Sequence, residues 1–160
     1  MVAADFSLRE IDLLAVYPAY RQAGRSQSKF NSLCSPKEFP LKDITEKIIA
    51  CAIEVHSNLG PGLLESVYEE ALAYEFELRG INFERQKEIM LEYKGRSIGP
   101  HRIDFLIEGQ VILEIKAAEG MKKIFEAQVL TYMKAIKKKV GLLINFNVER
   151  LKDGIKRLVL

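Results

Sequence analysis

The chain has 160 residues, 48% of them hydrophobic and 29% charged, which is typical of one globular domain with a sizeable core. The formal net charge of +2 is too small for the whole molecule to attract nucleic acid, so any such surface has to be local. No apolar run is long enough to span a membrane, and two cysteines without disulfide or metal-site spacing favour a reducing compartment, so we expect a cytoplasmic protein.

The chain divides into two parts. Residues 1–40 combine proline, glycine, serine and basic residues without sustained periodicity, which predicts a loosely ordered N-terminal extension. Residues 41–160 carry regular hydrophobic patterns, and we expect them to form the folded domain.

Two helices are predicted at the start of this domain. Asp43 and Glu46 match a capping pattern, and apolar residues follow at helical spacing. The segment NLGPG, residues 58–62, separates the two helices. In the second helix, which ends before the C-cap residue Gly80, we expect a core-facing stripe made of Leu64, Val67, Ala71, Tyr74 and Leu78.

Strands follow the two helices. Residues 81–117 predict three or four strands separated by glycine and proline, and residues 121–139 predict a further helix. An apolar run at 140–146 predicts a buried strand, and residues 154–160 an edge strand. This order predicts an α/β or α+β fold in which helices pack on a mixed central sheet.

The segment RIDFLIEGQVILEIKA, residues 102–117, places charges in the middle of apolar strands. A three-residue loop over 108–110 sets Asp104 opposite Glu114 and leaves one face wholly apolar, whereas a two-residue turn mixes polar and apolar residues on both faces. The hydrophobic pattern therefore favours the longer loop. The expected apolar pairs are Ile103/Ile115, Phe105/Leu113 and Ile107/Val111, and the other face carries Arg102/Lys116, Asp104/Glu114 and Leu106/Ile112.

Two acidic residues directly opposite each other destabilise a strand pair, and a sequence that breaks a local rule in this way suggests a site. A divalent cation such as Mg²⁺ would resolve the conflict between Asp104 and Glu114. Lys116 lies on the same face, where it could stabilise charge developing on phosphorus. The alternative is a solvated strand face on which Arg102 and Lys116 neutralise two acids.

Asp104 followed by Glu114-Ile115-Lys116 resembles the D…(D/E)xK signature of the PD-(D/E)xK nuclease superfamily. Gly62, Glu65 and Tyr68 match the name-giving motif of the GxxExxY proteins, a group placed in that superfamily, and the similarity extends from Ile44 to the C-terminus. The resemblance implies a restriction-endonuclease-like core in α-β-β-β-α-β order. It also implies phosphodiester hydrolysis in nucleic acid, with Mg²⁺ (Mn²⁺ as a substitute) as the cofactor and DNA expected ahead of RNA.

The resemblance also implies roles for individual residues. Asp104 and Glu114 would be metal ligands with the Ile115 carbonyl, and Lys116 would be the catalytic lysine. Glu65 would be an acid supplied by the preceding helix and a further candidate ligand. A glutamate in the first turn of a helix is also favoured by the helix dipole alone, so Glu65 has a purely structural explanation as well.

Gln128 and Tyr132 match the Q-x-x-x-Y element of the RecB-like branch, in which this pair orders the site and contacts nucleic acid. The two residues are four apart and share a helix face, where Gln128 would need partners such as the acidic cluster or Lys116. Alternatively, Gln128 lies at the margin of an ordinary amphipathic helix. Tyr68 is expected to be a core or boundary aromatic residue with a bonded hydroxyl.

The leading interpretation is a small metal-dependent nuclease. The alternative is a non-catalytic nuclease-fold module that binds nucleic acid or a protein partner. A homodimer is compatible with the small size of the domain, although no particular residue supports it. A basic run that includes Lys134, Lys137, Lys138 and Lys139 could hold phosphates or could be a solvated face.

Overall fold

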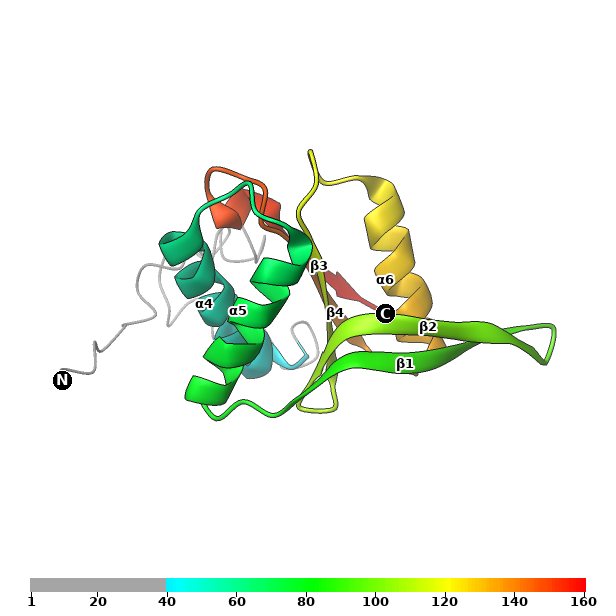
Figure 1. Ribbon diagram of the computed structural model, residues 1–160. Coiled ribbons are helices and arrows are strands. Elements are labelled where there is room, and N and C mark those ends of the chain that lie inside the picture. Colours follow the sequence, from blue (N-terminus) through cyan, green and yellow to red (C-terminus); the bar gives the residue numbers. More distant parts are fainter. Residues whose placement is uncertain (1–39) are drawn as a thin grey trace, which may run out of the picture.

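The computed structural model describes residues 40–160 (Figure 1), so the expected N-terminal extension lies outside the described residues except for Pro40. Within this range two helices precede the first strand, and further helices lie between the later strands. In chain order the elements are α4 (Lys42–Leu59), α5 (Glu65–Leu78), β1 (Phe83–Tyr93), β2 (Arg96–Ile107), β3 (Val111–Lys116), α6 (Lys123–Ala135), β4 (Val140–Asn145), the 3₁₀ helix η2 (Leu151–Gly154) and β5 (Ile155–Val159).

The strands form one five-stranded sheet in the order β1-β2-β3-β4-β5. β3 and β4 are parallel and are connected through α6, whereas the other neighbouring strands are antiparallel. This mixed sheet with flanking helices confirms the predicted α+β, restriction-endonuclease-like fold. No helix of the described part of the chain has both the length and the apolar character needed to cross a bilayer.

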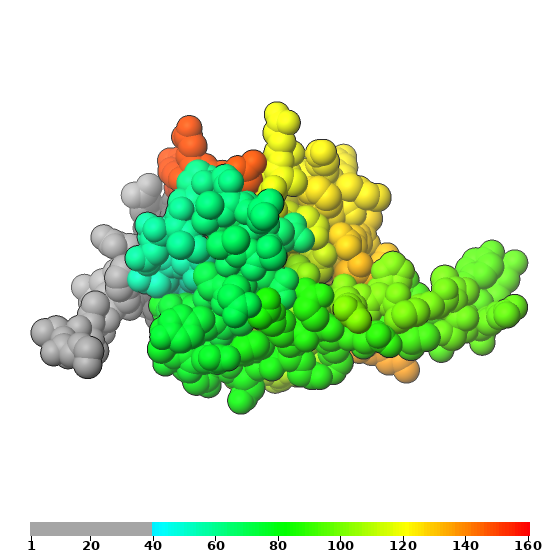
Figure 2. All heavy atoms as spheres, in the orientation of Figure 1, coloured from blue at the N-terminus to red at the C-terminus, as the bar shows by residue number. Residues whose placement is uncertain are grey.

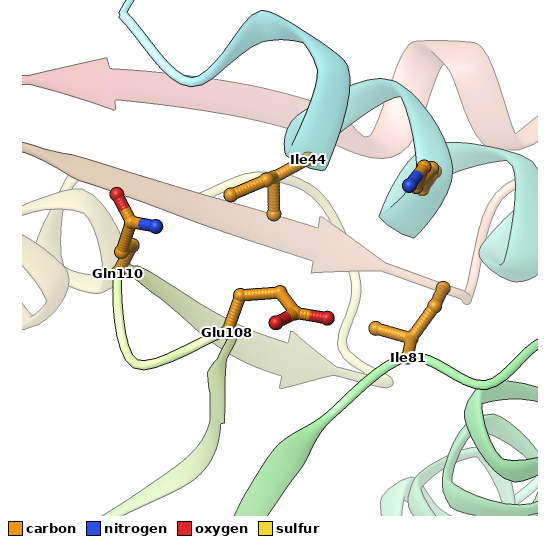
Figure 3. A pocket seen from close by; sticks show the side chains of 5 residues that line it. Ile44, Ile81, Glu108 and Gln110 are labelled. Atoms are coloured by element: carbon orange, nitrogen blue, oxygen red, sulfur yellow. The ribbon is translucent and has the colours of Figure 1, made fainter.

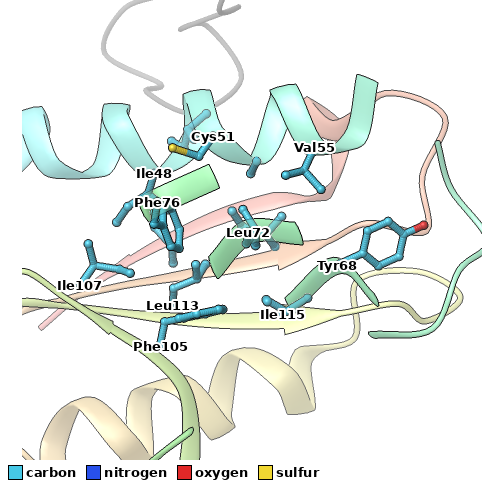
Figure 4. Packing of buried hydrophobic residues seen from close by; sticks show 14 of the residues in the cluster. Ile48, Cys51, Val55, Tyr68, Leu72, Phe76, Phe105, Ile107, Leu113 and Ile115 are labelled. Atoms are coloured by element: carbon cyan, nitrogen blue, oxygen red, sulfur yellow. The ribbon is translucent and has the colours of Figure 1, made fainter. Parts of the chain in front are cut away.

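Helices cover both faces of the sheet. α4 and α5 lie on one face and α6 on the other (Figure 1). The larger hydrophobic cluster fills the space under α4 and α5, where Phe76 packs edge-to-face on Phe105 with ring centroids 5.5 Å apart (Figure 4). The smaller cluster lies under α6, which approaches β4 at Gly141. A Cβ atom at Gly141 would lie 2.7 Å from Val129, so this glycine permits the close packing.

The expected core-facing stripe of α5 is wrong. Leu64 is 75% exposed, and Tyr74 and Leu78 are each 62% exposed. The helix instead buries Tyr68, Leu72, Ala73 and Phe76. Both sets are apolar at helical spacing, and a shift of one residue turns a helix by about 100°, so the pattern alone did not distinguish them. The larger rings of Tyr68 and Phe76 occupy the core.

The ends of two helices also differ from the predictions. Leu41, not Asp43, is the N-cap of α4, and no side chain caps this end; Asp43 lies in the first turn instead. The helix expected over 121–139 covers only Lys123–Ala135, since Lys137 adopts a positive φ of 54° that ends it.

The predicted hairpin register is confirmed. Phe105 pairs with Leu113, Leu106 with Ile112, and Ile107 with Val111 across a three-residue loop. The ladder between β2 and β3 ends at Phe105, however, and Ile103 packs in the cluster under α6 rather than on the face of Phe105. Gln86, which would lie opposite Asp104 on β1, has a φ of 50° and is missing from the regular pairing at the level where the β2–β3 ladder ends.

Candidate active site

The candidate site lies where β2 separates from β3. Glu114 and Lys116 come from β3, Asp104 from β2, and Glu65 from the first turn of α5. Lys116 Nζ lies 2.8 Å from Glu114 Oε1 and 3.9 Å from Glu65 Oε1. The fold therefore brings together the lysine and two of the acids that the sequence indicated, although Glu65 is about 50 residues away from them in the chain.

Asp104 does not form the direct ladder pair with Glu114 that the register predicted. Its Oδ2 accepts a hydrogen bond of 2.7 Å from the backbone N–H of Ile115, and its Oδ1 accepts one of 3.4 Å from Gln86 Nε2. The backbone ladder between β2 and β3 ends at Phe105. The Asp104 carboxylate therefore accepts from the Ile115 N–H in place of a backbone carbonyl of β2. The strand separation thus turns Asp104 toward β3.

Glu114 is the most buried acid of the site, with 3% of its surface exposed. Burial raises its pKa to about 7, the charge of Asp104 adds to this increase, and Lys116 opposes it. Burial also raises the pKa of Asp104, against the opposing effects of the Ile115 N–H and Lys116. Glu114 Oε2 is buried and has no hydrogen-bond partner among residues 40–160.

Burial would lower the pKa of Lys116, but the hydrogen bond and charge of Glu114, together with Glu65 and Asp104, outweigh it and raise the pKa. The ammonium also lies 5.7 Å from the centre of the Phe125 ring. Lys116 is therefore held in its charged form beside the acids.

The residues of the site fit a small, hard cation. Residues 40–160 contain no group of three or more His, Cys, Asp and Glu side chains placed to hold a metal. Mg²⁺ commonly binds one or two protein carboxylates and retains several waters. The unpartnered Glu114 Oε2 and the carboxylate of Asp104 are oxygen ligands of the required kind.

The loop before Glu65 is fixed by Tyr68. The Tyr68 hydroxyl donates to the Gly60 carbonyl at 2.7 Å and accepts from the Leu63 N–H at 3.1 Å, and its ring stacks on Phe146 with centroids 4.4 Å apart. Gly62 lies between these contacts with a φ of 94°, which favours glycine. Tyr68 is thus a buried aromatic residue with a bonded hydroxyl, as predicted.

Gln128 and Tyr132 are partners of each other. Gln128 Nε2 donates to the Tyr132 hydroxyl at 2.7 Å, and the Tyr132 ring lies 5.9 Å from that of His101 on β2. Within the described residues neither side chain bonds to an acid of the site or to Lys116. The expectation that the acidic cluster or Lys116 would satisfy Gln128 is therefore wrong, because the residue four positions along the same helix face does so.

Two residues around the site were not singled out from the sequence. Gln86 donates a hydrogen bond to Asp104, and its unusual backbone conformation is visible only in the structure. The sequence pattern carries no signal for it. Asn145 is fully buried beside Lys116 in the β3–β4 register, and it bonds to both backbone groups of Ala118 in the loop that follows β3. A polar residue that ends the apolar run VGLLIN was a usable signal for Asn145.

A pocket of about 290 Å³ lies away from this site (Figure 3). It is lined by residues that include Ile44 of α4, Ile81, and Glu108 and Gln110 of the β2–β3 loop. Since Glu114 and Lys116 lie toward the other end of β3, this pocket is not part of the carboxylate cluster.

The comparison with protein families agrees with this arrangement. A model of the PD-(D/E)XK nuclease superfamily matches residues 42–158, and the chain belongs to this superfamily. The match supports a nuclease fold that binds nucleic acid; the assignments to the GxxExxY group and to the RecB-like branch stay predictions. Neither the curated proteins nor the solved structures give a match to this chain.

Proposed function

We propose that the domain is a Mg²⁺-dependent nuclease that hydrolyses phosphodiester bonds in DNA. The observation that carries this proposal is the contact of Lys116 with Glu114 next to Asp104, with one buried carboxylate oxygen left unpartnered. Membership of the nuclease superfamily supports the same conclusion. A purely structural ion pair between Lys116 and Glu114 would not require Asp104 nearby, whose charge raises the pKa of Glu114.

Asp104 and Glu114 would hold the cation, together with the carbonyl of Ile115. In an extended strand the N–H and C=O of one residue point to the same side, so this carbonyl faces the side on which the Ile115 N–H meets Asp104. When bound, Mg²⁺ would supply positive charge that polarises the phosphoryl group and makes a water molecule more acidic.

Lys116 would place its ammonium beside the phosphoryl group and offset the negative charge that develops there. Its raised pKa keeps the ammonium charged at neutral pH. Glu65, 3.9 Å from Lys116, would orient this ammonium and serve as a further acid of the site. Gln128 and Tyr132 would order the side of the site formed by α6 and contact the nucleic acid.

Cleavage by wild type and Lys116→Ala tests the proposal, using single-stranded, duplex and branched DNA and RNA with Mg²⁺ or Mn²⁺. We expect cleavage by wild type that is abolished by EDTA and lost in Lys116→Ala. Lys47→Ala is the matched control, because Lys47 is an exposed lysine on α4, away from the carboxylate cluster. Binding without cleavage in every combination of substrate and metal would instead indicate the non-catalytic module.

A further inference from the structure

β1 and β2 extend beyond the sheet as a two-stranded ribbon. Only Phe105–Ile107 of β2 pair with β3, whereas β1 and β2 pair with each other from Phe83/Ile107 to Tyr93/Arg96. Residues 87–103, which we call the arm, therefore stand out from the body of the molecule (Figures 1 and 2). α6 covers only its base, where Ile89 and Ile103 are buried.

We infer that the arm docks along double-stranded nucleic acid next to the active site. The inference rests on the proposed nuclease function and assigns it a duplex substrate. The charge, shape and position of the arm each support it.

The charges of the arm are mostly unpaired. Lys94, Arg96 and Arg102 form no ion pair with any acid of residues 40–160, whereas Lys87 at the base of the arm is paired with Glu84, and Arg79 and Arg85 of the body are also paired. The arm also carries Glu88 and Glu92, so its lysines and arginines exceed its acids by two. Lys94 and Arg96 flank Gly95 at the tip, and the Lys94 ammonium lies 5.4 Å from the centre of the Tyr93 ring. Unpaired cations on a projecting ribbon are available to phosphates, whose neutralisation provides most of the affinity for a duplex.

The shape of the arm fits a groove. The major groove of B-DNA admits a two-stranded β-ribbon. The arm also exposes Met90, Tyr93 and Ile98, which are 49–62% exposed and could contact sugars and thymine methyl groups. A single strand would instead be bound by stacking on several aromatic rings, and Tyr93 is the only Phe, Tyr or Trp residue among residues 87–103.

The arm is continuous with the site. β2 runs from Arg96 at the tip to Asp104, a distance of about 26 Å for eight residues at roughly 3.3 Å per residue. About eight base pairs, at roughly 3.4 Å each, cover the same length. A duplex with a phosphate at Asp104 can therefore extend along the arm and contact the cations at its tip.

The test measures binding of the full chain to a 20-base-pair duplex and to a single strand of the same length, in EDTA to prevent cleavage. Lys94→Ala/Arg96→Ala removes both tip cations. Lys47→Ala/Arg150→Ala removes the same charge from exposed positions of the body, outside both the arm and the basic run of α6, and is the matched control. We expect the tip variant to lose duplex affinity by roughly tenfold or more, and its log–log salt slope to fall by about two. The control and the charge-conserving variant Lys94→Arg/Arg96→Lys should bind the duplex within about twofold of wild type.

Equal losses in the tip variant and the control, or an equal loss for single strands and duplex, would overturn the inference. Light scattering tests whether the arm instead binds a second copy of the chain. A wild-type dimer that is lost in the tip variant would also overturn the inference. The two proposals fail separately. Arm-dependent duplex binding without cleavage by wild type would refute only the nuclease, and cleavage with arm-independent binding would refute only the docking of the arm.

Discussion

Lys116 Nζ lies 2.8 Å from Glu114 Oε1, whereas Glu114 Oε2 is buried without a hydrogen-bond partner in the described part of the chain. One lysine therefore satisfies only half of the carboxylate, and Asp104 adds a second negative charge nearby. The site contains more negative charge than the described residues neutralise, which makes it sensitive both to protons and to cations.

The free energy of unfolding should depend on pH through Glu114. Burial raises its pKa from an ordinary value of 4.5 to about 7 in the folded chain, so the proton is held more tightly in the folded state. The protonated Glu114 therefore contributes its full stabilisation to the folded chain below pH 4.5, and this stabilisation is lost as the pH rises to 7. This loss is at most about 3 kcal/mol. Asp104, whose pKa is also raised, acts in the same direction.

Urea denaturation of wild type and Glu114→Gln between pH 4 and 8, without divalent cations, measures this contribution. We expect Glu114→Gln to gain stability relative to wild type as the pH rises through this range, because glutamine does not ionise. Glu119→Gln, at an exposed position, should follow wild type. Parallel curves for wild type and Glu114→Gln would show that folding leaves the pKa of Glu114 unchanged.

Divalent cations should stabilise the folded chain at pH 7. A ligand at about 100 times its dissociation constant adds about 2.7 kcal/mol to the free energy of unfolding. Thermal denaturation with increasing Mn²⁺ or Mg²⁺ should show a rise in Tm for wild type and none for Asp104→Asn/Glu114→Gln. The same rise in both proteins would place the cation elsewhere.

Tyr68→Phe should destabilise the fold by about 1–3 kcal/mol, because it leaves the Gly60 carbonyl and the Leu63 N–H without their partner. Hydrogen exchange at the Leu63 amide should become faster for the same reason. Tyr74→Phe is the matched control, since Tyr74 is 62% exposed on the same helix. Equal stability of the two variants would mean that water replaces the hydroxyl at little cost.

Gly141→Ala should cost about 1–3 kcal/mol, because the new methyl group would meet Val129 Cγ1 at 2.7 Å and Met133 Sδ at 2.8 Å. Val129→Ala removes one of these contacts. The double variant should therefore lose less stability than the two single losses added together. Additive losses in urea denaturation would show that α6 moves away from β4 without strain.

The fold class and the hairpin register could be predicted from the sequence because polar and apolar residues alternate in the short strands, and few registers keep one face of the hairpin apolar. A slip of one residue in the 102–117 hairpin would have moved charges into the core. The divergence of β2 from β3 at Asp104 was not predictable, since it coincides with a φ of 50° at Gln86, a residue type with no strong preference for that conformation.

The site was only partly predictable. Glu114 and Lys116 are two residues apart on one strand, so their proximity followed from local geometry. The stripe of α5 was wrong because two apolar faces compete on that helix, and tertiary packing selects the one with Tyr68 and Phe76. The partner of Gln128 was misjudged for a related reason: a neighbour on the same helix satisfied the amide.

Asp104 and Glu114 are only ten residues apart in the chain, across a tight loop. The entropy of loop closure for so short a segment is small, so hydrophobic pairs in the hairpin are sufficient to hold two like charges near each other. The repulsion between these two acids thus acts within one local hairpin, and Glu65 of α5 makes a smaller contribution to it. Binding of a proton or a cation would therefore rigidify this hairpin first, and protection of its amides from exchange should increase before that of α4.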